Sequence, residues 1–321
     1  MRILVTGGAG FIASHVVDAY LKLGHEVAVL DDLSRGFRHN VNPNARFYHG
    51  DIQDRAFVRH VFSEWKPAVV NHHAAQMDVR RGVREPVFDA SVNILGSLTL
   101  LEEAVAYKTS RFIYVSTAGA AYGEPKHFPV PEDAAINPIT PYGISKHTVE
   151  HYLFTFCHLY DIPYVVLRYG NVYGPRQSSQ GEAGVFAIFC EQLINGIQPV
   201  IYGDGGKTRD YVYIEDVAQA NVAALDRGNR EIFNIASGIA TTDLEVFSVV
   251  YKLLGRGILH PRFVPVRPGE INDIYLDVTK AKRLLDWEPK VALEEGAERT
   301  VSFFREMAES VVRTGGQNPH K

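Results

Sequence analysis

Short apolar runs alternate with amphipathic stretches along the first half of the chain. Runs of the length and composition of buried parallel strands are expected at 2–6, 26–30, 46–49, 68–72, 111–116 and 163–169. Apolar residues with helical spacing follow most of these runs, at 14–23, in a stretch ending at Trp65, at 87–107 and at 142–160. Repeated strand–helix units of this length predict an α/β fold with a doubly wound parallel sheet.

The alternation loosens after residue 169, where Gly and Pro punctuate longer loops. We expect a first domain over 1–169, to which a segment at about 212–238 returns. A smaller, mixed α/β domain is expected over 170–211 and 239–313. The last residues, 314–321, are expected to form a flexible tail.

The composition excludes several classes of protein. The 321 residues are 46% hydrophobic and 22% charged, with a net charge of -4, as in ordinary globular proteins. Because the chain has no long basic run, we expect neither nucleic acid nor a membrane as its main partner. Two cysteines, Cys157 and Cys190, do not make a disulfide framework, and no apolar stretch reaches membrane-spanning length. We expect a cytoplasmic protein.

A glycine-rich turn follows the first expected strand. Residues 7–13 read Gly-Gly-Ala-Gly-Phe-Ile-Ala, which fits G-x-x-G-x-x-A from Gly7 and G-x-G-x-x-A from Gly8. Such glycines let the backbone approach a pyrophosphate, whose charge then lies at a helix N-terminus. Asp31 follows about 20 residues later, at the end of a strand, where a carboxylate binds ribose hydroxyls. The pattern predicts NAD rather than NADP, and Arg35 is the one nearby residue that favours a 2′-phosphate.

A tyrosine and a lysine lie four positions apart at Tyr142 and Lys146. In a helix they would be one turn apart on nearly the same face, and the preceding Pro141 suits a first turn. A cation beside a phenol favours the phenolate, so we expect a Tyr142 pKa below its usual value of about 10. Tyr-x-x-x-Lys is a weak signal by itself. The second copy, from Tyr122 to Lys126, contains Gly and Pro, which argue against a helix.

Several motifs occur together in a fixed order. They are Gly7-Gly-Ala-Gly-Phe-Ile, Asp31-Asp-Leu, Gly50-Asp-Ile, the Tyr142 and Lys146 pair, Arg168-Tyr-Gly-Asn-Val-Tyr-Gly-Pro-Arg, Gly203-Asp-Gly-x-x-x-Arg-Asp-Tyr-Val-Tyr, Arg267-Pro-Gly-Glu and Leu285-Asp-Trp-Glu-Pro. This set resembles the extended short-chain dehydrogenases/reductases that act on nucleotide sugars, most of all the UDP-glucose 4-epimerases. The resemblance implies a Rossmann domain that binds NAD, a smaller domain that binds a UDP-hexose, and a homodimer.

The resemblance also implies a role for individual residues. The implied cofactor contacts are Gly7, Gly10, Phe11, Ile12, Asp31, Asp32, Ser34, Gly36, Asp51, Ile52, His73, Ala74, Ala75, Gln76, Asn93, Ser116, Tyr142, Lys146 and Tyr169. The implied substrate contacts are Asn171, Val185, Tyr202, Arg209, Arg267 and Glu270. Tyr142, as phenolate, would take the proton of the sugar 4-hydroxyl while NAD oxidises C4, and hydride would return to the other face. Lys146, the nicotinamide charge and the exclusion of water are expected to lower the pKa of Tyr142.

The chain departs from the family where a hydroxyl contacts the sugar. Many relatives have Ser or Thr at the position of Ala118, and we expect Thr117, or else Ser116, to replace it. Dehydratases carry Thr-Asp-Glu at 118–120, so Ala-Gly-Ala argues against elimination of water. Other candidates are a UDP-glucuronate epimerase or decarboxylase, a 4-keto-sugar reductase, and a non-catalytic sensor of NAD or nucleotide sugars. Relatives have either a bulky or a small residue at the position of Ile274, which affects whether N-acetylated sugars are accepted. The intermediate size of isoleucine leaves that specificity open.

One pattern typical of metal sites is interpreted as a coincidence. The stretch from His147 to His151 fits the H-x-x-E-H pattern of zinc proteases. At about 100° per helical residue, the two histidines point roughly 140° and 180° away from Tyr142. We expect no metal.

Overall fold

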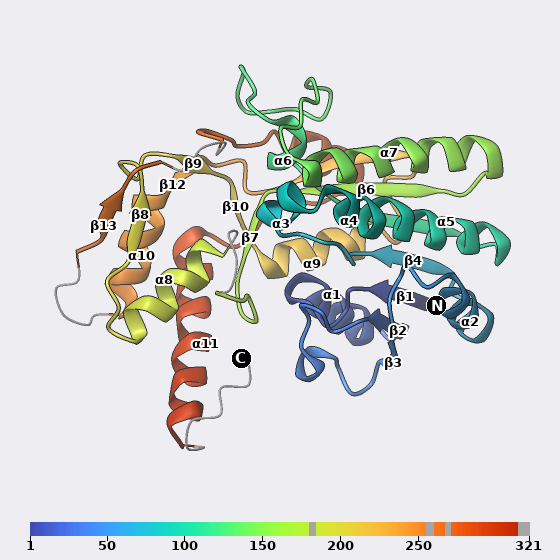
Figure 1. Cartoon of the computed structure of the whole chain (residues 1–321), viewed down its shortest axis with the longest axis horizontal. Coiled ribbons are helices and arrows are strands. Elements are labelled where there is room, and N and C mark those ends of the chain that lie inside the picture. Colours follow the sequence, from blue (N-terminus) through green and yellow to red (C-terminus); the bar gives the residue numbers. More distant parts are fainter. Residues whose placement is uncertain (180–183, 255–259, 267–270, 314–321) are drawn as a thin grey trace.

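The computed structural model describes residues 1–179, 184–254, 260–266 and 271–313. Its centre is a seven-stranded parallel sheet with the order β11-β6-β5-β4-β1-β2-β3 (Figure 1). The strands are β1 (Arg2–Thr6), β2 (Glu26–Asp31), β3 (Arg46–His49), β4 (Val69–His72), β5 (Arg111–Thr117), β6 (Tyr164–Tyr169) and β11 (Glu231–Ile235). The strand order reverses at β1, and the sheet is therefore doubly wound, which confirms the predicted fold class.

Helices cover both faces of this sheet because its strands are apolar on both sides. Helices α1 (Phe11–Lys22) and α9 (Ile214–Ala223) lie on one face (Figure 1). Helices α2 (Arg55–Trp65), α5 (Gly96–Ala106) and α7 (Pro141–Tyr160) lie on the other. Helix α1 begins three residues before the predicted start at 14, directly after the glycine-rich turn.

The helix predicted over 87–107 consists of three consecutive segments. Helix α4 (Pro86–Ala90) is followed by a π-helical turn (Ser91–Leu95) and then by α5. Asn93, in the π turn, is buried; its Oδ1 accepts from the backbone N–H of Gln76 at 2.8 Å and its Nδ2 donates to the Gln76 carbonyl at 2.9 Å. The wider turn therefore accompanies an amide that ties this helix to the loop after β4, a placement common at functional sites.

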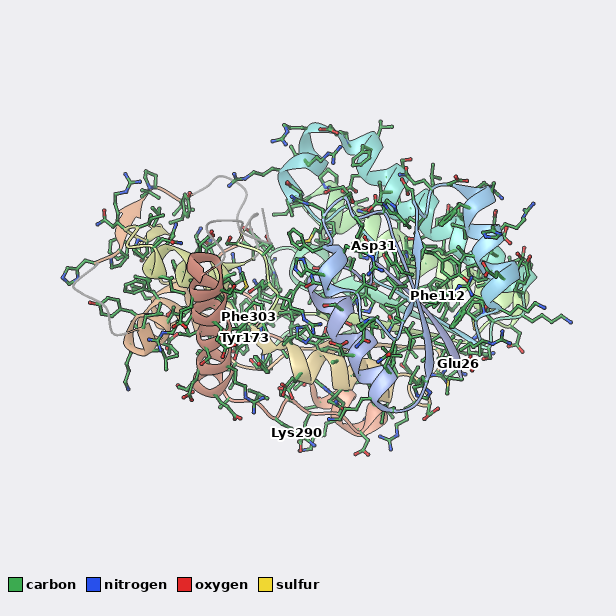
Figure 2. The ribbon with its side chains drawn as sticks, turned by 90° about the horizontal axis from the view of Figure 1, so that it is seen from below. Glu26, Asp31, Phe112, Tyr173, Lys290 and Phe303 are labelled. Atoms are coloured by element: carbon green, nitrogen blue, oxygen red, sulfur yellow. The ribbon has the colours of Figure 1, made fainter. Side chains whose placement is uncertain are left out.

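A second region lies beside the sheet, at the left of Figure 1. Its helices are α8 (Val185–Ile194), α10 (Asp243–Leu254) and α11 (Leu293–Arg313), and its short strands pair as β7 (Asn171–Tyr173) with β10 (Tyr211–Tyr213), β8 (Val200–Tyr202) with β13 (Arg262–Val264), and β9 (Thr208–Arg209) with β12 (Thr241–Thr242). The rings of Tyr173 and Phe186 stack with centroids 4.1 Å apart. Figure 2 shows Tyr173 of β7 beside Phe303, which belongs to α11.

The remaining elements are short. They are α3 (Val79–Arg84), α6 (Gly119–Tyr122), a 3-10 turn (Arg38–Asn40) and a π turn (Ala281–Leu285). Strand β11 comes from the expected returning segment and pairs with β6 of the central sheet, while the division into two domains stays a prediction. The predicted tail, 314–321, lies outside the described residues. Among the helices that the structure describes, none is long and apolar enough to cross a membrane.

Candidate active site

The glycine-rich turn is held between the ends of β2 and β4. Gly7 has φ of +72°, and a β-carbon there would lie 2.7 Å from the backbone nitrogen of Ala74. The N–H of Gly7 donates to the carbonyl of Leu30 at 2.8 Å. Both the backbone conformation and the close neighbour therefore require glycine at position 7.

Asp31 is the last residue of β2 and lies at its carboxyl end, whereas Glu26 begins the same strand (Figure 2). Its Oδ2 accepts from the N–H of Ala9 at 2.9 Å, and its Oδ1 accepts from Leu33 at 2.8 Å. Burial raises the pKa of this carboxyl group, while the two backbone hydrogen bonds oppose the rise. Gly36 closes over the same turn, since a β-carbon there would lie 2.7 Å from the Ala9 side chain.

These residues fit NAD. The glycine turn leads directly into α1, which has no side-chain cap at Gly10 and no acidic residue in its first turn, so its N–H groups can donate hydrogen bonds to a pyrophosphate. Asp31 lies where a ribose is expected. Further along, Asp32 accepts from the Ser34 hydroxyl, and Asp51 accepts from the Gln53 N–H at 2.8 Å.

The loop after β4 completes this side of the site. The N–H of Ala74 donates to the Thr6 hydroxyl at 3.2 Å, and Gln76 is bound to Asn93 as described above. Burial and the nearby Lys146 lower the pKa of His73 to about 3, so its imidazole is neutral. Of the other predicted contacts, Phe11 and Ile12 open α1, and Ala75 lies in this loop directly after Ala74. Ile52 follows β3 and is buried against Gly96.

The start of α7 places Tyr142 and Lys146. The Thr140 hydroxyl caps the helix by accepting from the Gly143 N–H at 3.2 Å, and Pro141 takes the first helical position. Tyr142 is half-buried, and within the described part of the chain its hydroxyl makes no hydrogen bond. Lys146 is only 2% exposed, with its Nζ 4.3 Å from the centre of the Tyr114 ring.

The prediction of a lowered pKa for Tyr142 is wrong for the chain by itself. Burial, with a smaller effect of Asp89, raises the pKa of Tyr142 to about 12. Burial also lowers the pKa of Lys146 to about 7, although Glu150 and Asp89 oppose this change. Exclusion of water penalises whichever form carries a charge, so it acts against the phenolate rather than for it.

The two candidate hydroxyl groups at the end of β5 differ in their bonding. The Ser116 hydroxyl is buried and donates to Oε1 of Glu150 at 2.6 Å. Thr117 is partly exposed, and its hydroxyl has no hydrogen-bond partner among the described residues. Ala118 is buried in an apolar cluster with Tyr122 and Ile274. Thr117 is therefore the candidate whose hydroxyl remains available to a ligand.

The predicted substrate residues come from the second region and from the end of β6. Asn171 opens β7, Val185 opens α8, and Tyr202 ends β8. Arg209 donates to the carbonyls of Thr208 (2.7 Å), Ile271 (2.7 Å) and Asn272 (3.0 Å). Arg267 and Glu270 lie outside the described residues. Tyr169 is buried at the end of β6, where its hydroxyl accepts from Asn221 at 2.6 Å.

Sequence reasoning missed the buried ion pair of Glu150 and Arg168, whose side chains meet at 2.6 Å. In the sequence, Glu150 stands out only as part of the zinc-like pattern. His147 Nδ1 instead lies 3.1 Å from Oε2 of Glu150, and across the described ranges no group of three or more His, Cys, Asp or Glu side chains is arranged for a metal. The sequence did hold a signal for Glu150, because it follows Lys146 by four residues and so lies one helical turn further on the same face.

Comparison with known proteins gives close matches over almost the whole chain. A sequence profile described as the NAD dependent epimerase/dehydratase family matches residues 3–236. A crystal structure of UDP-glucose 4-epimerase with UDP-glucose from Thermotoga maritima is 49% identical, with a TM-score of 0.94, covering 96% of this chain and 100% of that chain. A UDP-glucose 4-epimerase from Thermus thermophilus, in complex with NAD, is 43% identical, with a TM-score of 0.90 and coverage of 95% and 99%. A UDP-glucose 4-epimerase from Mycolicibacterium smegmatis is 42% identical over 311 residues, 95% of this chain and 99% of its own length.

Proposed function

The chain belongs to the NAD-dependent epimerase/dehydratase family, and from this premise we propose that it is a UDP-glucose 4-epimerase that interconverts UDP-glucose and UDP-galactose. The similarity to 4-epimerases at 42–49% identity supports the choice of substrate. The Ala-Gly-Ala stretch at 118–120 supports epimerisation over dehydration, because it offers no acid or base.

The observation that carries the chemistry is the placement of Tyr142. Its hydroxyl makes no hydrogen bond within the described chain, and Lys146 lies one turn further along the same helix. The end of β5 lies close by, since α6 packs on the start of α7: a β-carbon on Gly143 would meet the carbonyl oxygen of Ala120. Asn93 connects the loop after β4 to the same helix, because it donates to the Gln76 carbonyl and to the Ser145 hydroxyl. Tyr142 is thus an acid–base group at the carboxyl edge of the sheet, where such folds bind ligands.

The reaction assigns each group a task. Tyr142 Oη takes the proton of the sugar 4-hydroxyl and returns it after the 4-keto sugar has turned over. NAD, when bound, supplies the acceptor and donor of the C4 hydride, and its positive ring favours the phenolate. Lys146 stabilises the same phenolate, and the Thr117 hydroxyl orients the sugar hydroxyl. Because NAD is regenerated in every cycle, the reaction consumes none, and we expect the protein to retain it.

Arg209 is the described residue that best suits the diphosphate of the substrate. Three of its five N–H donors hold the carbonyls of Thr208, Ile271 and Asn272, so the guanidinium is fixed in place. Within the part of the chain that the structure describes, this leaves two donors for a phosphate, to which arginine binds through charge-assisted hydrogen bonds. Asn171, Val185 and Tyr202, with Arg267 and Glu270, complete the proposed binding site for the UDP-hexose.

The proposal includes a homodimer formed through α4, α5 and α7, with the π turn that joins the first two. These segments expose the large apolar side chains Val87, Leu95, Ile144, Tyr152, Phe154 and Leu159. On α7, Ile144, Tyr152 and Leu159 fall within about 80° of one another, opposite the buried face that carries Lys146. The test is sedimentation of the wild type and of Leu159→Glu. A dimeric wild type and a monomeric variant would support this arrangement, and a monomeric wild type would contradict it. A cytoplasmic location stays a prediction.

The direct test is NMR of the purified protein incubated with UDP-galactose, without added NAD. Formation of UDP-glucose establishes both the reaction and a retained cofactor. Conversion only after NAD is added preserves the reaction and contradicts retention. The absence of conversion with NAD present contradicts the proposed function.

A further inference from the structure

We infer that Glu150 is a positioning residue for the Tyr142 and Lys146 pair: its carboxylate fastens α7 to the ends of β5 and β6 and favours the charged form of Lys146 inside the protein. This role deepens the proposed function and rests on it for its catalytic meaning.

The first argument is the number of donors that surround one carboxylate. Oε1 accepts from the Ser116 hydroxyl at 2.6 Å and from Arg168 Nε at 3.0 Å. Oε2 accepts from Arg168 Nη2 at 2.6 Å and lies 3.1 Å from His147 Nδ1. These donors come from β5, β6 and α7 itself. The carboxylate is therefore the point at which the helix is bonded to two neighbouring strand ends.

The network continues beyond Arg168. Its Nη1 donates to the Tyr122 hydroxyl at 2.9 Å, and this hydroxyl donates to Oδ1 of Asn234 in β11 at 2.8 Å. Tyr122 ends α6, the short helix that packs on the start of α7. Removing the Glu150 carboxylate would leave the buried Arg168 cation without its counter-charge, which is costly.

The second argument is the position of Glu150 relative to Lys146. The two residues are one turn apart and both lie on the buried face of α7. Burial lowers the pKa of Lys146, and Glu150 is the strongest of the groups that raise it. If Glu150 only linked α7 to the strands, it would not need to lie on the same face of the helix as Lys146.

The other groups near Lys146 do not replace this charge. Asp89, from α4, also raises the pKa of Lys146. Burial lowers the pKa values of His72 and His73, at the end of β4, so both are neutral and leave the ammonium uncompensated. Burial raises the pKa of Tyr114 in β5, so its ring contacts Lys146 as a neutral phenol. Glu150 and Asp89 are thus the anions that face this lysine from the described elements.

The test measures the titration of Lys146 directly. Protein labelled with 13C at lysine Cε is titrated by NMR, and the Lys146 signal is assigned by its loss in Lys146→Met. In Glu150→Gln we expect the Lys146 midpoint to fall by about one unit, because an opposite charge that raises its pKa is lost. Glu103→Gln is the matched control, because Glu103 is also buried and paired with an arginine, Arg59, but lies on α5. Its Lys146 midpoint should equal that of the wild type.

A double variant, Glu150→Gln with Arg168→Met, separates positioning from folding. It removes the unpaired cation, so its thermal stability should exceed that of Glu150→Gln, while the Lys146 midpoint stays low. A wild-type midpoint in either variant, or failure of both to fold, overturns the inference. With UDP-galactose, the alkaline limb of kcat should move to lower pH by the same amount, with little change in KM. If the wild type converts no UDP-galactose, the proposed function fails while the NMR titration still decides the role of Glu150.

Discussion

Oε2 of Glu150 lies 2.6 Å from Nη2 of Arg168, and each of the two side chains is only 3% exposed. A buried ion pair stabilises a fold little compared with apolar residues of the same shape, but breaking one costs about 3–5 kcal/mol. Here the pair also binds Ser116, directly before the catalytic candidate Thr117. Its main effect is therefore on geometry, because it fixes how the helix that carries Tyr142 meets the end of β5.

Tyr142→Phe should abolish nearly all turnover of UDP-galactose. The ring is kept and only the proton carrier is lost, so we expect kcat to fall by about 10²–10⁴-fold. Tyr160→Phe is the control, since Tyr160 is exposed at the opposite end of the same helix, and it should keep kcat within about twofold. The measurement is the initial rate of UDP-glucose formation, with NAD content determined for each variant. Near-normal turnover by Tyr142→Phe would sink the assignment.

Thr117→Val and Ser116→Ala should have different effects. Valine keeps the shape of Thr117 and removes a hydroxyl with no partner in the described chain, so kcat should fall about tenfold to a hundredfold at nearly unchanged stability. Ser116→Ala takes one donor from the buried Glu150 carboxylate and should lower the free energy of unfolding by about 1–3 kcal/mol. Urea unfolding and steady-state rates of both variants test this contrast. The reverse pattern would assign the sugar contact to Ser116.

The sequence predicted the central sheet well because its strands and helices have separate signals. The apolar runs that end at Asp31 and Tyr169 are strands within one residue of their predicted bounds. The π turn at Asn93 could not be predicted, since it accompanies hydrogen bonds to the backbone of Gln76 that no local pattern displays. The prediction for the pKa of Tyr142 failed for a related reason, because burial depends on packing that no local pattern displays.

Gly7→Ala should weaken NAD binding, an effect that backbone strain by itself does not produce. Gly24 provides the comparison, since it has φ of +79° but no atom within 4 Å of an added β-carbon, whereas a β-carbon on Gly7 lies 2.7 Å from the Ala74 nitrogen. Both alanine variants should lose about 1 kcal/mol from the left-handed conformation. Gly7→Ala should lose further stability and release NAD during purification, as measured by the ratio of absorbance at 260 and 280 nm. If both variants retain the same amount of NAD, the close approach of the backbone to the cofactor at Gly7 is contradicted.

The ionisation of Glu150 should make stability fall in acid. Burial by itself would raise its pKa, but the donors His147, Arg168 and Ser116 lower it from 4.5 to about 2. A carboxyl group with a lowered pKa in the folded state stabilises the protein above pH 4.5 and loses that contribution as the pH falls towards 2. At 1.36 kcal/mol per unit, the contribution at neutral pH is about 3 kcal/mol. Glu150→Gln lacks this titration, so its unfolding free energy should decline less steeply than that of the wild type between pH 5 and pH 3. Urea unfolding at a series of pH values measures both slopes, and parallel curves would show that the Glu150 carboxylate gains nothing from its donors.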